Sequence, residues 1–306
     1  MDELSAKSSL LIAAGYEQSI PLLLTEQPVG TIHSVFPNGL NIRMGERLFF
    51  IGTTKNGQLP FGIHLTGRDL QEVLDAVNTQ SLISWKSTSR QVHFGEGAPV
   101  VSLTEDTSFN WEIKRSVVRR VDVIDNLAML LSVLLEEPHV SGLGVDIEDF
   151  LTAYLEGSGP LEPIDQQIYQ LLMILESSDV KEIVSVLRYF LGRGQGLTPS
   201  GDDHLVGLLA IHAGAGIMSQ TVVETLTHLV QHESLTTDIG REYLLYAADD
   251  KFSSTVVELA SALTQKTDIY MLKPLLLELL DMGHSSGIDT VFGMLLGLLA
   301  LRRKLE

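Results

Sequence analysis

Apolar and polar residues alternate along the first third of the chain, as is typical of half-buried β-strands. The alternation is clearest at residues 31–36 and 40–44, and the Asn38-Gly39 pair between them indicates a β-hairpin. Residues 67–78 instead carry apolar side chains at helical spacing. Several short strands and one helix predict a compact barrel or sandwich. Further strands are expected at 48–52, 61–65, 82–87, 91–94 and 100–103.

The pattern changes near Trp111, beyond which apolar residues recur every three or four positions. The first such run extends from Val117 to Leu134. So many apolar-faced helices predict a helical domain packed as a globule. We therefore expect an α+β protein with a β-rich domain over residues 1–112 and a larger all-helical domain over 113–306. The other helices are expected at 147–155, 166–175, 180–191, 205–213, 221–230, 236–247, 254–263, 272–280 and 290–302.

The composition is that of an acidic globular protein without cysteine. The 306 residues include 21 Lys and Arg against 39 Asp and Glu, a formal charge of −18, and such a surface repels nucleic acid. The lack of cysteine excludes disulfides, thiolate zinc sites and thiol nucleophiles. The first residues lack the basic lead of a secretory signal, and the apolar runs fall short of the roughly 20 residues of a membrane span. We therefore expect a cytoplasmic protein that binds neither nucleic acid nor membrane.

One short motif, Ser-Gly-x-Asp-x-x-x-Gly, occurs twice in the helical region, each time between two apolar helices. Its serine and aspartate fit a capping box, and its last glycine would allow close helix packing. In a second interpretation the two helix N-termini bind an anion through free backbone amides and the helix dipole. The two copies consist of Ser200, Gly201, Asp203 and Gly207, and of Ser286, Gly287, Asp289 and Gly293.

The residues before the first copy favour binding. Three alternate glycines, Gly192, Gly194 and Gly196, follow a predicted helix, whereas one glycine is enough to end a helix. Gly201 and Gly287 remove side chains from the first turns of the two helices, which leaves room for an anion there. No lysine follows the glycines, so the pattern differs from that of a P-loop.

Two adjacent acids, Asp202 and Asp203, require a nearby positive charge if the ligand is an anion. Arg193 supplies that charge in one hypothesis, and a magnesium ion held by the carboxylates supplies it in the other; the sequence leaves metal and cofactor unknown. We predict that Asp203, which has a counterpart in the second copy, caps its helix, and that Asp202 faces the ligand as a catalytic residue. His284, beside the second copy, is the predicted proton carrier.

The segment 194–207, Gly-Gln-Gly-Leu-Thr-Pro-Ser-Gly-Asp-Asp-His-Leu-Val-Gly, resembles the signature of a bacterial family that includes the AllH subunit of oxamate carbamoyltransferase. The Gly-His-Ser-Ser-Gly-x-Asp string from Gly283 is similar to that family's C-terminal motif, and Thr236-Thr237 lies where the family carries a threonine pair. The resemblance implies transfer of a carbamoyl group between phosphate and oxamate in anaerobic allantoin breakdown, within an assembly of this subunit and two others. By motif match it implies substrate contacts or catalytic roles for Arg193, Gly194, Gly196, Thr198, Ser200, Gly201, Asp202, Asp203, His284, Ser286 and Asp289.

Three functions are therefore candidates. The first is a transferase component that binds a carbamoyl phosphate-like anion between the two helix N-termini, with partner subunits in a hetero-complex. The second is a non-catalytic scaffold or ligand-sensing subunit, and the third is an ATP-dependent kinase or ligase with an atypical phosphate loop. The first candidate requires Ser200 and Ser286 to lie close together in the fold.

Overall fold

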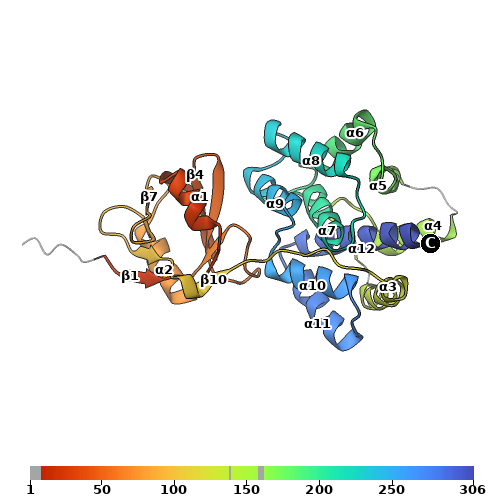
Figure 1. The fold of residues 1–306 in the computed structure, drawn as a ribbon, viewed down its shortest axis with the longest axis horizontal. Helices are drawn as coiled ribbons and strands as arrows, with labels where there is room; N and C mark the ends of the chain where they lie inside the picture. Colours follow the sequence, from red (N-terminus) through yellow and green to blue (C-terminus); the bar gives the residue numbers. More distant parts are fainter. Residues whose placement is uncertain (1–7, 138, 158–161) are drawn as a thin grey trace, which may run out of the picture. The chain divides into compact units, whose positions relative to one another are not determined.

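The computed structural model describes residues 8–137, 139–157 and 162–306. The chain divides into two compact units, Met1–Trp111, which is built on a β-sheet, and Glu112–Glu306, which is helical (Figure 1). The α+β class expected from the sequence is thereby confirmed.

The described part of the N-terminal unit contains one mixed ten-stranded sheet with the strand order β1-β9-β8-β7-β3-β4-β5-β6-β2-β10. β3 and β4 form the predicted antiparallel hairpin, with Pro37 and Asn38 between them. The strands are β1 (Leu10–Ile12), β2 (Gly15–Glu17), β3 (Val29–Phe36), β4 (Gly39–Met44), β5 (Arg47–Gly52), β6 (Gly62–His64), β7 (Leu82–Lys86), β8 (Gln91–His93), β9 (Val100–Ser102) and β10 (Ser108–Phe109).

The sheet curls because one short segment joins strands that are far apart in its order. β1 pairs with β9 and β2 pairs with β6, yet only Ala13 and Ala14 separate β1 from β2. Ala13 N donates to Ser102 O at 2.9 Å and Ala14 N donates to His64 O at 2.8 Å, which continues both pairings. The expected barrel-like module is thus a single curled sheet filled by one apolar cluster.

Two helices, α1 (Ile20–Glu26) and α2 (Gly67–Ala76), pack into this apolar cluster through Leu24, Leu70 and Val73. α2 is the helix expected from apolar spacing, and its N-cap is Thr66, whose hydroxyl accepts a hydrogen bond from Asp69 N. The sequence pattern misses α1, β1, β2 and β10, since each is too short to show a period.

The helical unit begins with an extended segment, so α3 starts at Arg120 rather than at Val117 as its spacing predicts. α7 and α12 start at Ser200 and Ser286, several residues before the expected positions, because the Ser-Gly-x-Asp motif has no apolar period. None of the helices in the described ranges is both long and apolar enough to cross a membrane. The helices of this unit are α3 (Arg120–Leu134), α4 (Ile147–Glu156), α5 (Pro163–Ile174), α6 (Val180–Phe190), α7 (Ser200–Ala215), α8 (Gln220–His232), α9 (Asp238–Ala248), α10 (Ser254–Thr264), α11 (Ile269–Leu280) and α12 (Ser286–Leu305).

α7 and α12 form the centre of the helical unit and are buried along almost their whole length. They meet at Gly207 and Gly293, the last glycines of the two motif copies. A Cβ at Gly207 would lie 2.1 Å from Thr290 O, and a Cβ at Gly293 would lie 2.2 Å from His204 O. Because real Cβ atoms do not come this close to a carbonyl oxygen, only glycine allows the two backbones to pack so tightly.

We predict that Gly207→Ala destabilises the helical unit by about 3 kcal/mol, because the new methyl group forces α7 away from α12. The expected fall in Tm is roughly 6–12 °C, to be measured by differential scanning calorimetry. Gly214→Ala, on the same helix, is the matched control, since its Cβ would lie 3.2 Å from the nearest atom of the Thr264 side chain. Equal destabilisation by the two variants would contradict the close contact.

Candidate functional site

The N-terminal ends of α7 and α12 lie together. Thr198 Oγ1, in the loop before α7, is 2.9 Å from Ser286 Oγ at the start of α12. The hydroxyl of Ser286 hydrogen-bonds the carboxylate of Asp203, and the hydroxyl of Ser200 hydrogen-bonds that of Asp289. Each aspartate of the repeated motif is therefore held by the serine of the other copy. Since the last glycines of the two copies also meet, the two helices run parallel.

Three ionisable side chains are buried at this junction: Asp203, His204 and Asp289. His204 Nε2 is 3.4 Å from Asp289 Oδ1, and its ring packs edge-on against Phe292. Within the described residues, neither ring nitrogen of His204 and neither Oδ2 atom of the two aspartates has a well-formed hydrogen bond. Buried polar atoms without partners are rare in folded proteins, so this cluster is a candidate for chemistry.

The two aspartates of the cluster differ in proton affinity. Burial raises the pKa of Asp203 well above its usual range, and the hydrogen bond from Ser286 only partly opposes the effect. Burial acts in the same direction on Asp289, but the neighbouring His204 ring, the hydroxyl of Ser200 and the amide of Gly142 together outweigh it and lower the pKa of Asp289. Asp203 is thus the carboxyl group that holds its proton more tightly, and Asp289 the one that ionises.

The side chain of Asp202, which the sequence predicts to face the ligand, is held by donors of the protein. Its side chain is buried, its Oδ1 accepts from Gly192 N at 2.8 Å, and its Oδ2 accepts from the hydroxyl of Thr236. A Cβ at Gly240 would lie 2.5 Å from Asp202 Oδ2, so the start of α9 also packs against this carboxylate. Asp202 therefore ties α7 to the end of α6 and to α9. Burial raises the pKa of Asp202 to about 6, against the hydrogen bonds from Gly192 and Thr236.

The predicted capping boxes are absent. Pro199 and Ser285 occupy the N-cap positions of α7 and α12 without a side-chain cap, and the motif serines are the first helical residues. Gly201 N donates to Arg193 O at 2.8 Å, and Gly287 N donates to Met282 O at 3.0 Å. The anion-binding interpretation requires free amides at the starts of these helices, but these two amides are already hydrogen-bonded to backbone carbonyls.

The glycine loop before α7 explains this arrangement. Gly192, Gly194 and Gly196 have φ values of +71°, +116° and +94°, in the left-handed region that side chains rarely adopt. These turns bring the loop back over the start of α7, where Arg193 O meets the helix. The three glycines that the sequence marks as unusual therefore shape the loop, and the amide of Gly192 is bound to Asp202.

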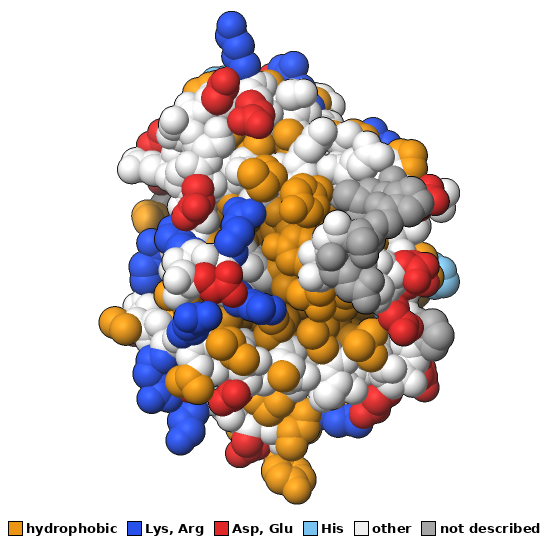
Figure 2. All heavy atoms as spheres, turned by 90° about the vertical axis from the view of Figure 1, so that its right-hand side faces the viewer, with side chains coloured by type: hydrophobic (Ala, Val, Ile, Leu, Met, Phe, Trp, Pro, Cys, Tyr) orange, Lys and Arg blue, Asp and Glu red, His pale blue; other side chains and the backbone are white. Residues whose placement is uncertain are grey.

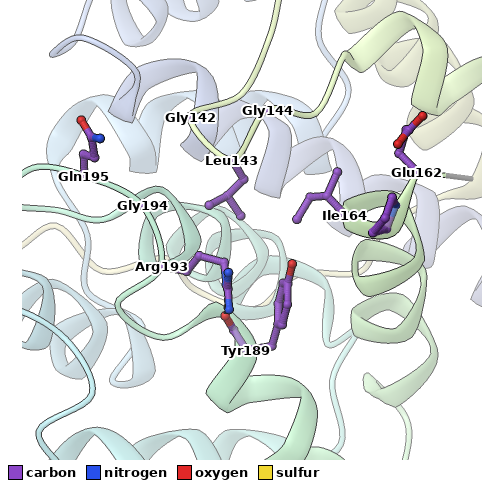
Figure 3. Close-up of a pocket in the computed structure, with 10 residues that line it drawn as sticks. Gly142, Leu143, Gly144, Glu162, Ile164, Tyr189, Arg193, Gly194 and Gln195 are labelled. Carbon is purple, nitrogen blue, oxygen red and sulfur yellow. Dashed lines mark hydrogen bonds between the residues drawn. The ribbon is translucent and has the colours of Figure 1, made fainter.

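An open pocket of about 700 Å³ lies beside this loop (Figure 3). Leu143 and Ile164 point toward one another across it, and Tyr189 and Arg193 lie together on its lower side. The guanidinium carbon of Arg193 is 3.9 Å from the centre of the Tyr189 ring, and Arg193 Nε donates to Tyr189 O at 2.7 Å. The pocket is lined by Gly142, Leu143, Gly144, Glu162, Pro163, Ile164, Tyr189, Arg193, Gly194 and Gln195.

Two glycines of the pocket wall lie directly on the buried cluster. Gly142 N donates to Asp289 Oδ1 at 2.8 Å, and a Cβ at Gly142 would lie 2.1 Å from Ser200 Oγ. A Cβ at Gly194 would lie 2.6 Å from Ser200 N. The pocket is thus separated from the N-terminus of α7 by two residues without side chains.

The structure sorts the predicted site residues other than Asp202 into four groups. Arg193 and Gly194 line the pocket, while Thr198, Ser200, Asp203, Ser286 and Asp289 form the junction next to it. His284 and Gly196 are exposed and do not line the pocket, and Gly201 and Gly287 pack against the ends of α6 and α11.

Sequence reasoning missed His204, Tyr189 and the 142–144 loop. His204 directly follows the two adjacent acids, and Gly142 and Gly144 enclose one leucine in a short segment between helices. These two local features are the signals in the sequence that could have pointed to the missed residues, which come together only when the chain folds.

Asp202 is not placed to hold a bridging magnesium ion. Both oxygens of Asp202 are engaged by donors of the protein, so this carboxylate is not available as a ligand. Among the residues described here, no group of three or more His, Cys, Asp or Glu side chains is placed to hold a metal ion.

Comparison with known families identifies the chain. The family model described as oxamate carbamoyltransferase subunit AllH matches residues 190–298, which contain both motif copies, and the model of the AllH family N-terminal domain matches residues 8–106. The chain belongs to the AllH family. We call the place where the N-terminal ends of α7 and α12 meet the AllH junction. Together the two matches cover β1 to β9 of the curled sheet, all of α7 and most of α12. No solved structure matches the chain significantly.

We predict that Asp202→Asn changes how stability depends on pH. The pKa of Asp202 is raised from 3.8 to about 6 in the folded state, so the folded protein binds this proton more tightly than the unfolded chain does. The resulting contribution to the free energy of unfolding is complete below about pH 4 and is lost as the pH rises through 6. The loss amounts to about 3 kcal/mol, and the asparagine does not titrate. Urea unfolding of both proteins from pH 4 to pH 7 should therefore show the variant gaining relative stability. A constant difference across this range would contradict the assignment.

Gly142→Ala tests the contact between the pocket wall and the AllH junction. The added methyl group would overlap Ser200 Oγ, so the loop must move and Asp289 loses the hydrogen bond from the Gly142 amide. We expect a loss of about 1–3 kcal/mol in the free energy of unfolding, measured by urea denaturation. Gly67→Ala, whose Cβ would meet open space, is the control and should leave stability unchanged or slightly higher. A neutral Gly142→Ala variant would show that the loop is not seated on these oxygens.

Proposed function

We propose that the chain is a cytoplasmic subunit of an oxamate carbamoyltransferase-type enzyme, and that it binds a small anionic substrate in the pocket beside Arg193. The enzyme would transfer a carbamoyl group between phosphate and oxamate in allantoin breakdown, together with partner subunits. The observation that carries the proposal is the position of Arg193, which lies in the segment matched by the AllH model and lines the pocket at the start of α7.

The local chemistry favours an anion at this place. Stacking on Tyr189 and the hydrogen bond from Nε orient the guanidinium of Arg193, while its two Nη groups are suited to a bidentate contact with carboxylate or phosphate. The N-terminus of α7, with the positive end of its dipole, lies behind Gly194. A chain with a net charge of −18 repels anions at long range, so a local cation has to provide the attraction.

The same arginine would assist the reaction. When a carbamoyl group leaves phosphate, negative charge grows on the leaving oxygen, and a guanidinium held in place beforehand stabilises that charge. This chain offers no nucleophilic cysteine, so direct attack by the acceptor substrate is the route that we favour over a thiol intermediate.

Isothermal titration of the full chain with carbamoyl phosphate, oxamate and phosphate tests the proposal. We expect binding of at least one of these anions, and a 10- to 100-fold weaker affinity in Arg193→Ala, which is the effect of about 1.5–3 kcal/mol that a charged hydrogen bond contributes. Arg188→Ala is the matched control, because Arg188 lies on α6 one turn away and is bound to Glu233. This variant should bind as the wild type does.

Two outcomes would contradict the proposal. One is the absence of heat with all three anions, with and without magnesium. The other is full carbamoyltransferase activity of the Arg193→Ala chain in complex with its partner subunits, which would favour the scaffold function instead. A thermal-shift screen with ATP and magnesium distinguishes the transferase and scaffold functions from a kinase or ligase, because only the last would be stabilised by the nucleotide.

A further inference from the structure

The exposed side of α3 carries a regular apolar stripe. Val121, Ile124, Ala128, Leu131 and Leu135 follow one another at intervals of three, four, three and four residues, which places them on one side of the helix. Val121, Ile124 and Leu135 are 54%, 43% and 49% exposed. We call these five residues the α3 stripe.

The stripe is not part of the core of the helical unit. The opposite side of α3, with Val123, Leu127, Leu130 and Leu134, is buried and packs against α10, α11 and α12. α3 is therefore apolar on two sides, whereas a surface helix needs only one apolar side. The face with α3, α4 and the C-terminal end of α12 is turned to the viewer in Figure 2, where hydrophobic side chains are exposed and Lys and Arg lie beside them. An apolar stripe of this kind is typical of a helix–helix interface.

The charges at the ends of α3 point to its partner. Arg119 and Arg120 stand at the N-terminus, and Glu136 and Glu137 follow the C-terminus. The helix dipole favours the reverse arrangement, so it does not account for the position of these charges. Arg119 is bonded to Asp122 and Glu136 to Lys273, and the side chains of Arg120 and Glu137 are exposed.

An antiparallel second copy of α3 would complement both features. It brings the basic end of one helix beside the acidic end of the other, and it opposes the two dipoles. The first four residues of the stripe are symmetric about position 126, so Val121 would lie level with Leu131 of the other copy, and Ile124 with Ala128. The small Ala128 leaves room for the larger Ile124 at each of these contacts. A parallel copy would instead place Arg120 beside Arg120.

We propose that the α3 stripe is the interface of a homodimer in which two copies of α3 pack antiparallel around a two-fold axis near residue 126. Such an interface is isologous, since the same surface serves both copies. The inference does not depend on the substrate or on the role of Arg193.

Sedimentation velocity of the full chain at micromolar concentration and physiological salt gives the first test. We expect a species of twice the 33.6 kDa chain mass, and a monomer in Ile124→Glu, because a buried carboxylate at the centre of the interface is unpaired. Val180→Glu, an equally exposed apolar position on α6, is the control and should stay dimeric. Thermal unfolding of both variants shows whether each is folded. A monomeric wild type, or a dimer that persists in folded Ile124→Glu, overturns the proposal.

Disulfide trapping tests the orientation, and the absence of cysteine from the chain makes it clean. Val121→Cys and Leu131→Cys are prepared separately, mixed and oxidised. For an antiparallel dimer we expect a disulfide cross-link between the two variants in the mixture, and at most a trace of cross-linked dimer when either variant is oxidised alone. Efficient cross-linking of Val121→Cys with itself would mean parallel packing and would overturn the antiparallel model. A chain that is monomeric alone and binds a different subunit through the α3 stripe would also overturn the homodimer.

Discussion

The helical unit depends on the backbone contact between Gly207 and Gly293. This contact sets how closely α7 and α12 approach, and it lies about two turns from the N-terminal end of each helix. At that spacing the serine of each motif copy reaches the aspartate of the other, which it could not do across a wider gap. The two motif copies therefore act together. Their glycines permit the close approach, and their polar residues fix the register of the two parallel helices.

The same packing has an electrostatic cost. It buries Asp202, Asp203, His204 and Asp289 close to one another, in a chain that is already strongly acidic. Hydrogen bonds offset part of this cost, since Asp202 receives two and Asp289 receives the amide of Gly142. The remainder is not offset, because the described residues give His204 and the Oδ2 atom of Asp203 no well-formed partner. A fold selected for stability alone would replace such groups, so their presence next to the pocket supports a function there.

The sequence predicts those parts of the fold that arise from local pattern. Alternation gives the β3–β4 hairpin, and apolar spacing gives most of the helices, since both signals need only neighbouring residues. The pairing of the two motif copies could be suspected because the same residues recur, but their roles could not. Capping requires the motif serine to lie before the helix, and the glycine loop instead moves the start of α7 to Ser200 itself. The contacts of Asp202 and Asp203 could not be predicted for the same reason: which acid meets Thr236 and which meets Ser286 depends on packing between helices far apart in the chain.

The same packing also affects the electrostatic environment of the pocket. An anion beside Arg193 lies near several carboxyl groups, and their combined charge would oppose its binding. Burial reduces that opposition at Asp203, because it raises the pKa of that carboxyl well above its usual range. Asp202, with a pKa raised to about 6, stays mostly ionised at neutral pH, and the amide of Gly192 and the hydroxyl of Thr236 are bound to its charge. Asp289 also ionises, and the amide of Gly142 and the ring of His204 lie next to its charge. The low dielectric that makes the AllH junction costly to bury thus also disfavours ionisation of Asp203. Under the proposed function, Arg193 would offset the acidic side chain of Glu162, which lines the same pocket.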